Sequence, residues 1–348
     1  MASAKGIVHA RFVVAAGLLL LAIGLAGPAA ASPTVDAIRS RGELACGVST
    51  GVAGWSQPDS QGHWTGFDVD MCRAIAAAVI GNADKVKFVP LSAQQRFTAL
   101  QAGEVDVLSN RATWSLIRDA SLGINFLTIV FYDGQSFLVP KKLNLKSARE
   151  LAGATICVQP GTTSELNLAD YLRTNHVDAK VLTIEDRDAV EQAYFSGRCD
   201  SFSTDATSLA ATRAGRAASA DDHVILPERI SKEPLSPAVR RGDDEFFGIA
   251  KWCIYAVIDA EEKGVTSANV DQMLKSENPE IQRMLGVTPG MGKALGLDEQ
   301  WAYRIVKQVG NYSEIFERNV GINTPLHLER GQNALWTHGG MIYAPPIR

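Results

Sequence analysis

A strand–helix alternation that occurs twice along the chain is the feature that most constrains its fold. In the first unit, apolar strand-like segments alternate with helical patterns at residues 44–49, 67–80, 86–90, 92–103 and 105–108. Ser92 and Gln95 have the spacing of a capping box, which predicts that the second helix begins at Ser92. This order predicts a parallel sheet covered by helices, and therefore an α/β fold.

The alternation returns between residues 146 and 203. A short helix at 146–151 precedes strands and helices that alternate at 155–158, 163–172, 181–184, 188–195 and 199–203. Both units contain a glycine, two further residues and an aspartate just before a polar loop, at residues 103–106 and 197–200. One such motif is common in α/β proteins, but two at matching places predict two similar lobes. Because ligands bind at the carboxyl ends of strands in open α/β sheets, the loops 109–113 and 203–205 are expected to line one cleft.

The length of 348 residues fits about two domains. Extended segments at 135–139 and 235–240 are expected to connect the lobes, with Pro234 and Pro237 stiffening the return path. An apolar helix at 245–262 is expected to pack back on the first lobe.

These expectations divide the chain into a discontinuous first lobe and a second lobe inserted in it. The first lobe comprises residues 32–137 and 238–348, including a C-terminal extension, and the second comprises residues 138–237. Residues 276–321 have a helical pattern broken by Gly and Pro, and the Gly- and Pro-rich residues 331–348 are expected on the surface.

The first 31 residues have the pattern of a secretory signal peptide. Lys5 and Arg11 supply the positive start, an apolar run covers residues 12–25, and three alanines at 29–31 predict cleavage before Ser32. The run is too short to span a bilayer, and no cysteine near the cut offers a lipid anchor. We therefore expect a periplasmic protein.

Five cysteines are present in this predicted secreted chain. Two bridges and one free thiol can be chosen in fifteen ways, between which the sequence does not decide. The pairing that joins a strand to a nearby element in each lobe is Cys46–Cys72 and Cys157–Cys199, with Cys253 free. For any one pair, reduced and buried thiols are an equal alternative. There is no C-x-x-C spacing and the histidines are scattered, so we expect no metal site.

Two enzyme motifs and a nucleic-acid surface are excluded. Residues 47–51 read Gly-Val-Ser-Thr-Gly, but Gly54, Pro58 and Gly62 follow, so the helix that a nucleophile elbow requires cannot begin. Near Lys293 a phosphate-binding loop fails because the Ser or Thr that must follow the lysine is an alanine. The net charge is −4 and no basic run occurs, which argues against nucleic-acid binding.

Three residues at predicted strand ends suit a zwitterion. Burying a carboxylate and an ammonium requires a partner for each charge. Arg118 can fork onto the carboxylate, and Thr163 at a helix start offers N–H groups and a favourable dipole. Asp205 can hold the ammonium. A single Arg or Asp is usually a solvated surface charge, so these residues matter as a set.

The chain resembles the substrate-binding proteins of polar-amino-acid ABC importers, and more narrowly their longer general L-amino-acid-binding subgroup. The likeness spans most of residues 36–348. It is carried by the motifs at residues 66–70, 96–106, 113–119, 158–166, 197–205, 231–235 and 334–337. The resemblance implies a two-lobed type II clamshell of the periplasmic-binding-protein kind, with two crossovers, that closes on its ligand.

The same resemblance implies roles for individual residues. Arg118, Thr113 and Thr163 would bind the α-carboxylate of the ligand, and Asp205 its ammonium. The loop that contains Ser49, Val52 and Trp55 would face the ligand side chain. Trp55 and Trp114 are candidates to cover it, although a Trp more often simply packs in the core. Ser49 stands where cationic-ligand binders often have an acid, and Val52 where they often have an aromatic residue, which favours a permissive pocket.

The resulting hypothesis is a monomeric binding protein without a cofactor. It captures free L-amino acids and delivers them to the membrane subunits of an ABC permease. One alternative is a secreted, dehydratase-like enzyme on the same scaffold, but His63, the histidine nearest the predicted cleft, is expected on a surface turn. The other alternative is a ligand-loaded sensor that docks on a membrane receptor.

Overall fold

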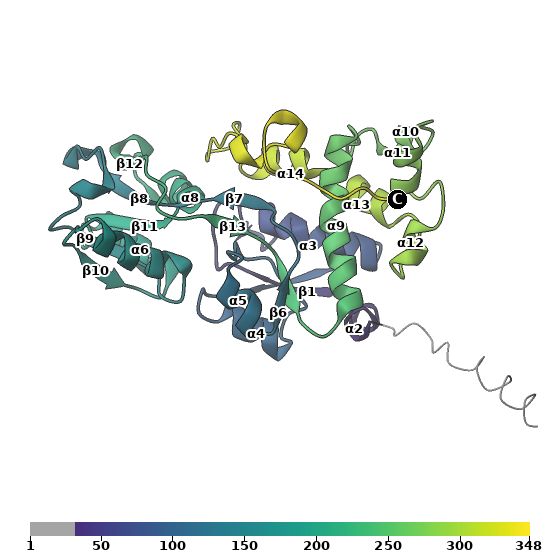
Figure 1. The fold of residues 1–348 in the computed structure, drawn as a ribbon, viewed down its shortest axis with the longest axis horizontal. Coiled ribbons are helices and arrows are strands. Elements are labelled where there is room, and N and C mark those ends of the chain that lie inside the picture. Colours follow the sequence, from purple (N-terminus) through teal and green to yellow (C-terminus); the bar gives the residue numbers. More distant parts are fainter. Residues whose placement is uncertain (1–31) are drawn as a thin grey trace, which may run out of the picture.

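The computed structural model describes residues 32–348, so the predicted signal peptide, residues 1–31, lies outside the described part. The chain forms two α/β lobes side by side along the long axis of the molecule (Figure 1). Each lobe is built on one five-stranded sheet. The predicted two-lobed α/β fold class is confirmed.

The first sheet has the strand order β4-β1-β5-β14-β6. Its strands are β1 (Leu44–Val48), β4 (Val86–Pro90), β5 (Val107–Leu108), β6 (Ile124–Phe126) and β14 (Ala238–Arg240). β1 is apolar and wholly buried, and it pairs in parallel with β4 on one side and β5 on the other. β14 lies antiparallel between β5 and β6, so a strand from late in the chain completes this sheet.

The second sheet repeats the same plan in the order β10-β9-β11-β8-β12. Its strands are β8 (Gln135–Pro140), β9 (Thr155–Val158), β10 (Lys180–Thr183), β11 (Ser201–Asp205) and β12 (His223–Ile225). Three strands are parallel, and β8 runs antiparallel to β11. The shared plan explains why similar sequence phrases precede the polar loops of both lobes.

Helices cover both sheets. Those at residues 67–79, 96–102, 163–174, 187–195 and 244–262 correspond to predicted helices, whereas those at 33–41, 116–121 and 206–216 were not predicted. The first lobe has α2 (Pro33–Arg41), α3 (Phe67–Val79), α4 (Arg96–Ala102), α5 (Leu116–Ser121) and α9 (Asp244–Glu262), and the second has α6 (Thr163–Thr174), α7 (Arg187–Phe195) and α8 (Ala206–Arg216). α9 packs against α3, as expected. The predicted start of α4 at Ser92 is wrong. The Ser92 hydroxyl accepts the Gln95 N–H at 3.3 Å, but this closes a turn before the helix.

The lobes are joined by a short antiparallel pair, β7 (Phe131–Asp133) with β13 (Glu233–Leu235). The predicted connecting segments, 135–139 and 235–240, overlap β8 and β14 instead, because their backbone groups pair within the two sheets. The predicted division at 137/138 therefore falls inside β8. The division of the chain into its two lobes otherwise stays a prediction.

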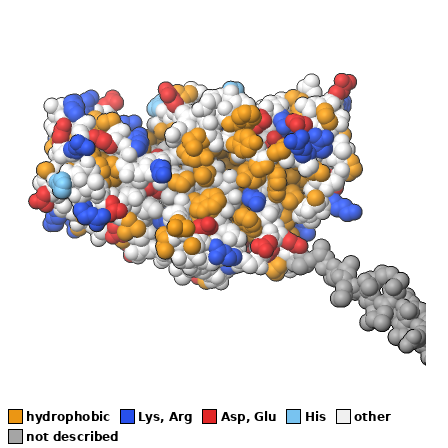
Figure 2. Space-filling model, in the orientation of Figure 1, with side chains coloured by type: hydrophobic (Ala, Val, Ile, Leu, Met, Phe, Trp, Pro, Cys, Tyr) orange, Lys and Arg blue, Asp and Glu red, His pale blue; other side chains and the backbone are white. Residues whose placement is uncertain are grey.

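The C-terminal region adds a helical layer to the first lobe, as the broken pattern predicts. It contains α10 (Val270–Met273), α11 (Pro279–Met284), α12 (Met291–Ala294), α13 (Trp301–Val309) and α14 (Tyr312–Asn319). The expectation that residues 331–348 lie on the surface is only half right. Leu335 and Ile342 are 1% exposed and join the core of this lobe. Figure 2 shows hydrophobic side chains gathered over the middle of the molecule and the first lobe, whereas charges of both signs mark the second.

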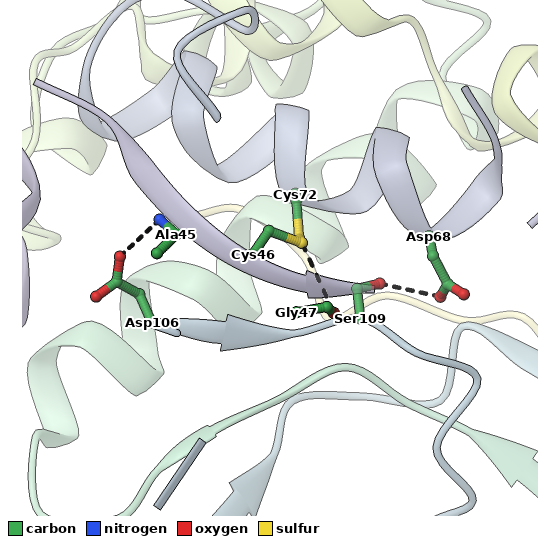
Figure 3. The surroundings of a disulfide bond; sticks show 7 residues. All are labelled: Ala45, Cys46, Gly47, Asp68, Cys72, Asp106 and Ser109. Carbon is green, nitrogen blue, oxygen red and sulfur yellow. Dashed lines mark hydrogen bonds between the residues drawn. A yellow bond between two sulfur atoms is a disulfide. The ribbon is translucent and has the colours of Figure 1, made fainter. Parts of the chain in front are cut away.

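Each lobe contains one of the two predicted disulfides. Cys46 on β1 bonds Cys72 on α3, which fixes a helix to the central strand of the first sheet (Figure 3). Cys157 on β9 bonds Cys199, which precedes β11. Cys253 on α9 is free and buried, as predicted.

Removing the first bridge should weaken the fold. For Cys46→Ala/Cys72→Ala we expect a loss of about 3 kcal/mol in the free energy of unfolding, because a bridge over 26 residues restricts the unfolded chain. Urea unfolding at 25 °C measures this loss. The matched control, Cys253→Ala, removes a buried sulfur outside any bridge and should lose about 1 kcal/mol. Equal losses would show that the bridge itself adds nothing.

Candidate functional site

A cavity lies between the two lobes, at the carboxyl ends of strands from both sheets. Its walls come from the loops that follow β1, β4, β5, β9 and β10 and from the end of β11. Five predicted site residues line it, namely Ser49, Val52, Thr113, Thr163 and Asp205. The lobes meet across it, since the hydroxyl oxygens of Thr113 and Thr163 lie 3.4 Å apart. The site is therefore shared between both lobes.

Three other predicted residues lie away from the cavity wall. Trp55 is 0% exposed and packs edge-on against Phe131, with ring centroids 4.9 Å apart, so it belongs to the core of the first lobe. Trp114 stacks on Phe126 at 5.6 Å. Both indoles take part in aromatic packing within one lobe. Neither indole lines the cavity, and a role for them in covering a ligand stays a prediction.

Arg118 lies just behind the wall, next to a residue that lines it. Its Nη1 donates to the backbone oxygen of Thr113 at 3.0 Å, and its guanidinium lies 5.0 Å from the Phe97 ring centroid. Burial lowers the pKa of Arg118, while Glu233 and Asp205 raise it. The guanidinium stays within the electrostatic reach of both carboxylates.

Asp205 ends β11 and precedes α8, which places its carboxyl at the cavity wall. It is only 7% exposed. Burial, together with repulsion from Asp133 and Glu233, raises the pKa of Asp205 to about 8, although Arg111 and Arg96 oppose the shift. Among residues 32–348 no ion pair involves Asp205, so its charged form needs a cation from outside the chain.

Glu233, on the crossover strand β13, is a central residue that the sequence analysis assigned only to a motif. It is 1% exposed and accepts hydrogen bonds from residues of both lobes. Thr113 donates to its Oε2 at 2.5 Å and Thr163 at 2.8 Å, while Asn167 and Ser231 donate to Oε1 at 2.8 and 2.6 Å. Each threonine has a single O–H, so neither hydroxyl has a proton left to donate to a ligand.

Three arginines line the cavity that the sequence analysis did not select: Arg96, Arg111 and Arg187. Arg96 begins α4 and donates to the Asn110 carbonyl at 2.9 Å. Arg111 has a left-handed backbone, with φ of 44°, which is uncommon for a residue with a side chain. Of the three, only Arg96 lies in a motif that the sequence resemblance uses, at residues 96–106.

A buried carboxyl supports the strand-end loop from behind. Asp68, at the start of α3, accepts a hydrogen bond from the Ser109 hydroxyl at 3.0 Å (Figure 3). Burial raises the pKa of Asp68 to about 6, against the opposing charge of Arg111. The motif at residues 66–70 thus fixes the loop that carries Arg111.

Two negative findings bear on the site, and both concern residues 32–348. No group of three or more His, Cys, Asp or Glu side chains is placed to hold a metal ion there. No helix in that range is both long and apolar enough to cross a bilayer.

A cavity between two α/β lobes with an antiparallel crossover defines the class of two-lobed periplasmic binding proteins. The chain belongs to the bacterial extracellular solute-binding proteins, family 3, whose family model matches residues 44–285. It is 52% identical to the general L-amino acid-binding periplasmic protein AapJ of Rhizobium johnstonii, over 96% of this chain and 98% of that protein.

Two further comparisons agree with this family. The glutamate/glutamine/aspartate/asparagine-binding protein BztA of Rhodobacter capsulatus is 49% identical, over 95% of this chain and 98% of that protein. A solved ABC-transporter periplasmic binding protein from Brucella ovis with glutathione bound has a TM-score of 0.89 and 50% identity, covering 90% of this chain and 99% of that one. The relatives are binding proteins, which favours a binding function over an enzymatic one.

The Glu233 network should contribute measurably to stability. For Glu233→Gln we expect the free energy of unfolding to fall by about 2 kcal/mol, because an amide places N–H groups against donors that need an acceptor. Urea unfolding measures the change. The control is the exposed Glu329→Gln, which should stay within about 0.5 kcal/mol of the parent. A parent-like Glu233→Gln would mean that the network adds no stability.

Proposed function

We propose that the protein binds free L-amino acids between its lobes in the periplasm and delivers them to the membrane subunits of an ABC importer. The observation that carries the proposal is Asp205, a buried carboxyl at the cavity wall with no cation paired to it. A ligand ammonium would supply the missing charge. The names of the relatives support amino acids as the ligand class, and that of AapJ supports a broad range of them.

The α-carboxylate requires donors from the opposite side of the ligand. We assign it to Arg118 and to the N–H groups at the start of α6, where Thr163 follows the capping residue Thr162. Arg96 supplies a further guanidinium at the wall. The hydroxyls of Thr113 and Thr163 bind Glu233 in this structure, so we assign them to holding the lobes together rather than to direct carboxylate contact.

Closure follows from this division of roles. A ligand that bridges residues of both lobes favours the closed form only through its additional affinity for that form. The closed pair then presents one surface to the permease. We propose that the protein acts as a monomer in this exchange.

A ligand screen tests the function directly. The mature protein is unfolded and refolded to remove any bound ligand, then melted with each of the twenty L-amino acids, several D-amino acids and sugars. A ligand present at 100 times its Kd adds about 2.7 kcal/mol of stability, which raises Tm. Glutathione is included because the Brucella ovis protein holds it. Stabilisation by several L-amino acids and by no sugar is the expected result. No shift with any compound would reject the proposal.

Removing the carboxyl of Asp205 should weaken amino-acid binding. We expect Asp205→Ala to bind about 2 to 5 kcal/mol more weakly, because a buried ammonium loses its partner. Isothermal titration calorimetry with a ligand from the screen measures the loss. Asp170→Ala, an exposed carboxyl on α6, is the control and should bind like the parent. Parent-like binding by Asp205→Ala would show that another group holds the ammonium.

Binding should also depend on pH through Asp205. Since its pKa is raised to about 8, the free protein holds a proton there at pH 7. The ligand ammonium favours the ionised carboxylate, so binding releases this proton. Affinity should therefore rise from pH 6 to pH 8, by up to about tenfold per unit. Calorimetry in buffers of different ionisation enthalpy detects the proton. A flat profile without proton release would contradict the assignment.

A further inference from the structure

Two arginines from opposite lobes meet at one side of the cavity. Arg111 belongs to the loop after β5, and Arg187 begins α7. Nη1 of Arg111 donates to the hydroxyl of Ser208 across the cleft, and Nη2 of Arg187 lies 3.4 Å from the Ser208 backbone oxygen. Both guanidinium groups thus approach a single residue, and both line the cavity.

This pair has unused donors. The Nε of Arg111 and the Nη1 of Arg187 are buried without a hydrogen-bond partner. Arg187 is 6% exposed, so water does not satisfy it freely. A buried donor without a partner costs about 1 to 3 kcal/mol, and more when it is charged. Such donors at a cavity wall indicate that an acceptor belongs there.

The charges of the chain neutralise the pair only in part, because Arg187 has a carboxylate partner and Arg111 has none in a salt bridge. Arg187 bonds Glu191 at 2.6 Å, but the same carboxylate also contacts Arg216 at 3.2 Å. In residues 32–348 Arg111 forms no salt bridge. Burial and the charge of Arg187 lower its pKa, while Asp205, Asp68 and Asp133 oppose this shift. Of the cavity acids on the same side, Asp186 caps α7 by accepting the Ala189 N–H at 2.7 Å. Neither Asp186 nor Glu185 forms a salt bridge within residues 32–348.

Arg111 and Arg187 lie on the side of the cavity where we expect the side chain of a bound amino acid. Arg187 also borders an adjoining groove, whose wall includes Thr50 and Val52 from the loop after β1. That loop is the one expected to face the side chain of a bound amino acid. Asp205 and the start of α6, which we assign to the ammonium and the α-carboxylate of the ligand, line the same cavity as the two arginines but are different residues.

We propose that Arg111 and Arg187 form an anion subsite that binds a second carboxylate, one carried by the ligand beyond its α-amino-acid head. The ligand class is an amino acid with an acidic side chain, or a γ-glutamyl peptide that presents a carboxylate at a similar reach. Uncharged side chains still enter, but they leave the two guanidinium donors unpaired. This inference rests on the proposed function and adds a ranking among its ligands.

The test compares ligands of matched shape on the parent and on Arg111→Gln. Calorimetry gives Kd for L-glutamate, L-glutamine, L-leucine and glutathione. The parent should bind glutamate at least about tenfold more tightly than leucine, because the carboxylate pairs buried charges. In Arg111→Gln, glutamate affinity should fall at least about tenfold, while leucine affinity changes less than about threefold. Tight binding of glutathione but not of glutamate would assign the subsite to the longer ligand.

Controls separate the subsite from general effects. Arg241→Gln removes a surface arginine of the first lobe that bonds only to residues of that lobe, and its ligand ranking should match the parent. Equal losses for glutamate and leucine in Arg111→Gln would overturn the subsite, because Arg111 would then serve the shared head. If that variant does not fold, the parent decides, since equal binding of leucine and of both acidic ligands overturns the proposal. Failure to bind any of the four ligands would instead reject the proposed function.

Discussion

The buried carboxylate of Glu233 is the interaction on which the arrangement of the two lobes depends. It lies on the crossover strand β13 and accepts hydrogen bonds from Thr113 of the first lobe and from Thr163 and Asn167 of the second. An ionised carboxylate accepts several hydrogen bonds at once, whereas each threonine donates only one. The network therefore fixes the cleft geometry and also determines which donors remain for a ligand.

Several charged groups of the cleft are buried without a close ion pair, although Arg187 pairs with Glu191. Asp205 lies at the cavity wall without a salt bridge, and burial together with the charges of Asp133 and Glu233 raises its pKa. Arg111 and Arg187 present unpaired donors from opposite lobes. A site with unsatisfied groups of both signs is complementary to a molecule that carries both charges, and the two-lobed frame brings those groups together.

The C-terminal helical layer of the first lobe is shared with the relatives. The sequence identity to AapJ and BztA extends over nearly the whole chain, so the C-terminal layer belongs to the shared design. That layer packs α13 and α14 against the first lobe and buries Leu335 and Ile342 there. None of its residues lines the cavity.

The sequence by itself determined the two α/β units, the strand-end loops and the cleft positions of Thr113, Thr163 and Asp205, because these follow from periodicity and motifs, whereas the cysteine pairing was decided by the fold. The tertiary structure alone decided that β8 and β14 complete the sheets, since edge pairing depends on distant backbone groups. It also decided that Trp55 packs in the core and that Glu233, Arg111 and Arg187 meet the cleft. Burial and contacts between segments far apart in the chain leave no local pattern in a sequence, so those roles required the folded chain.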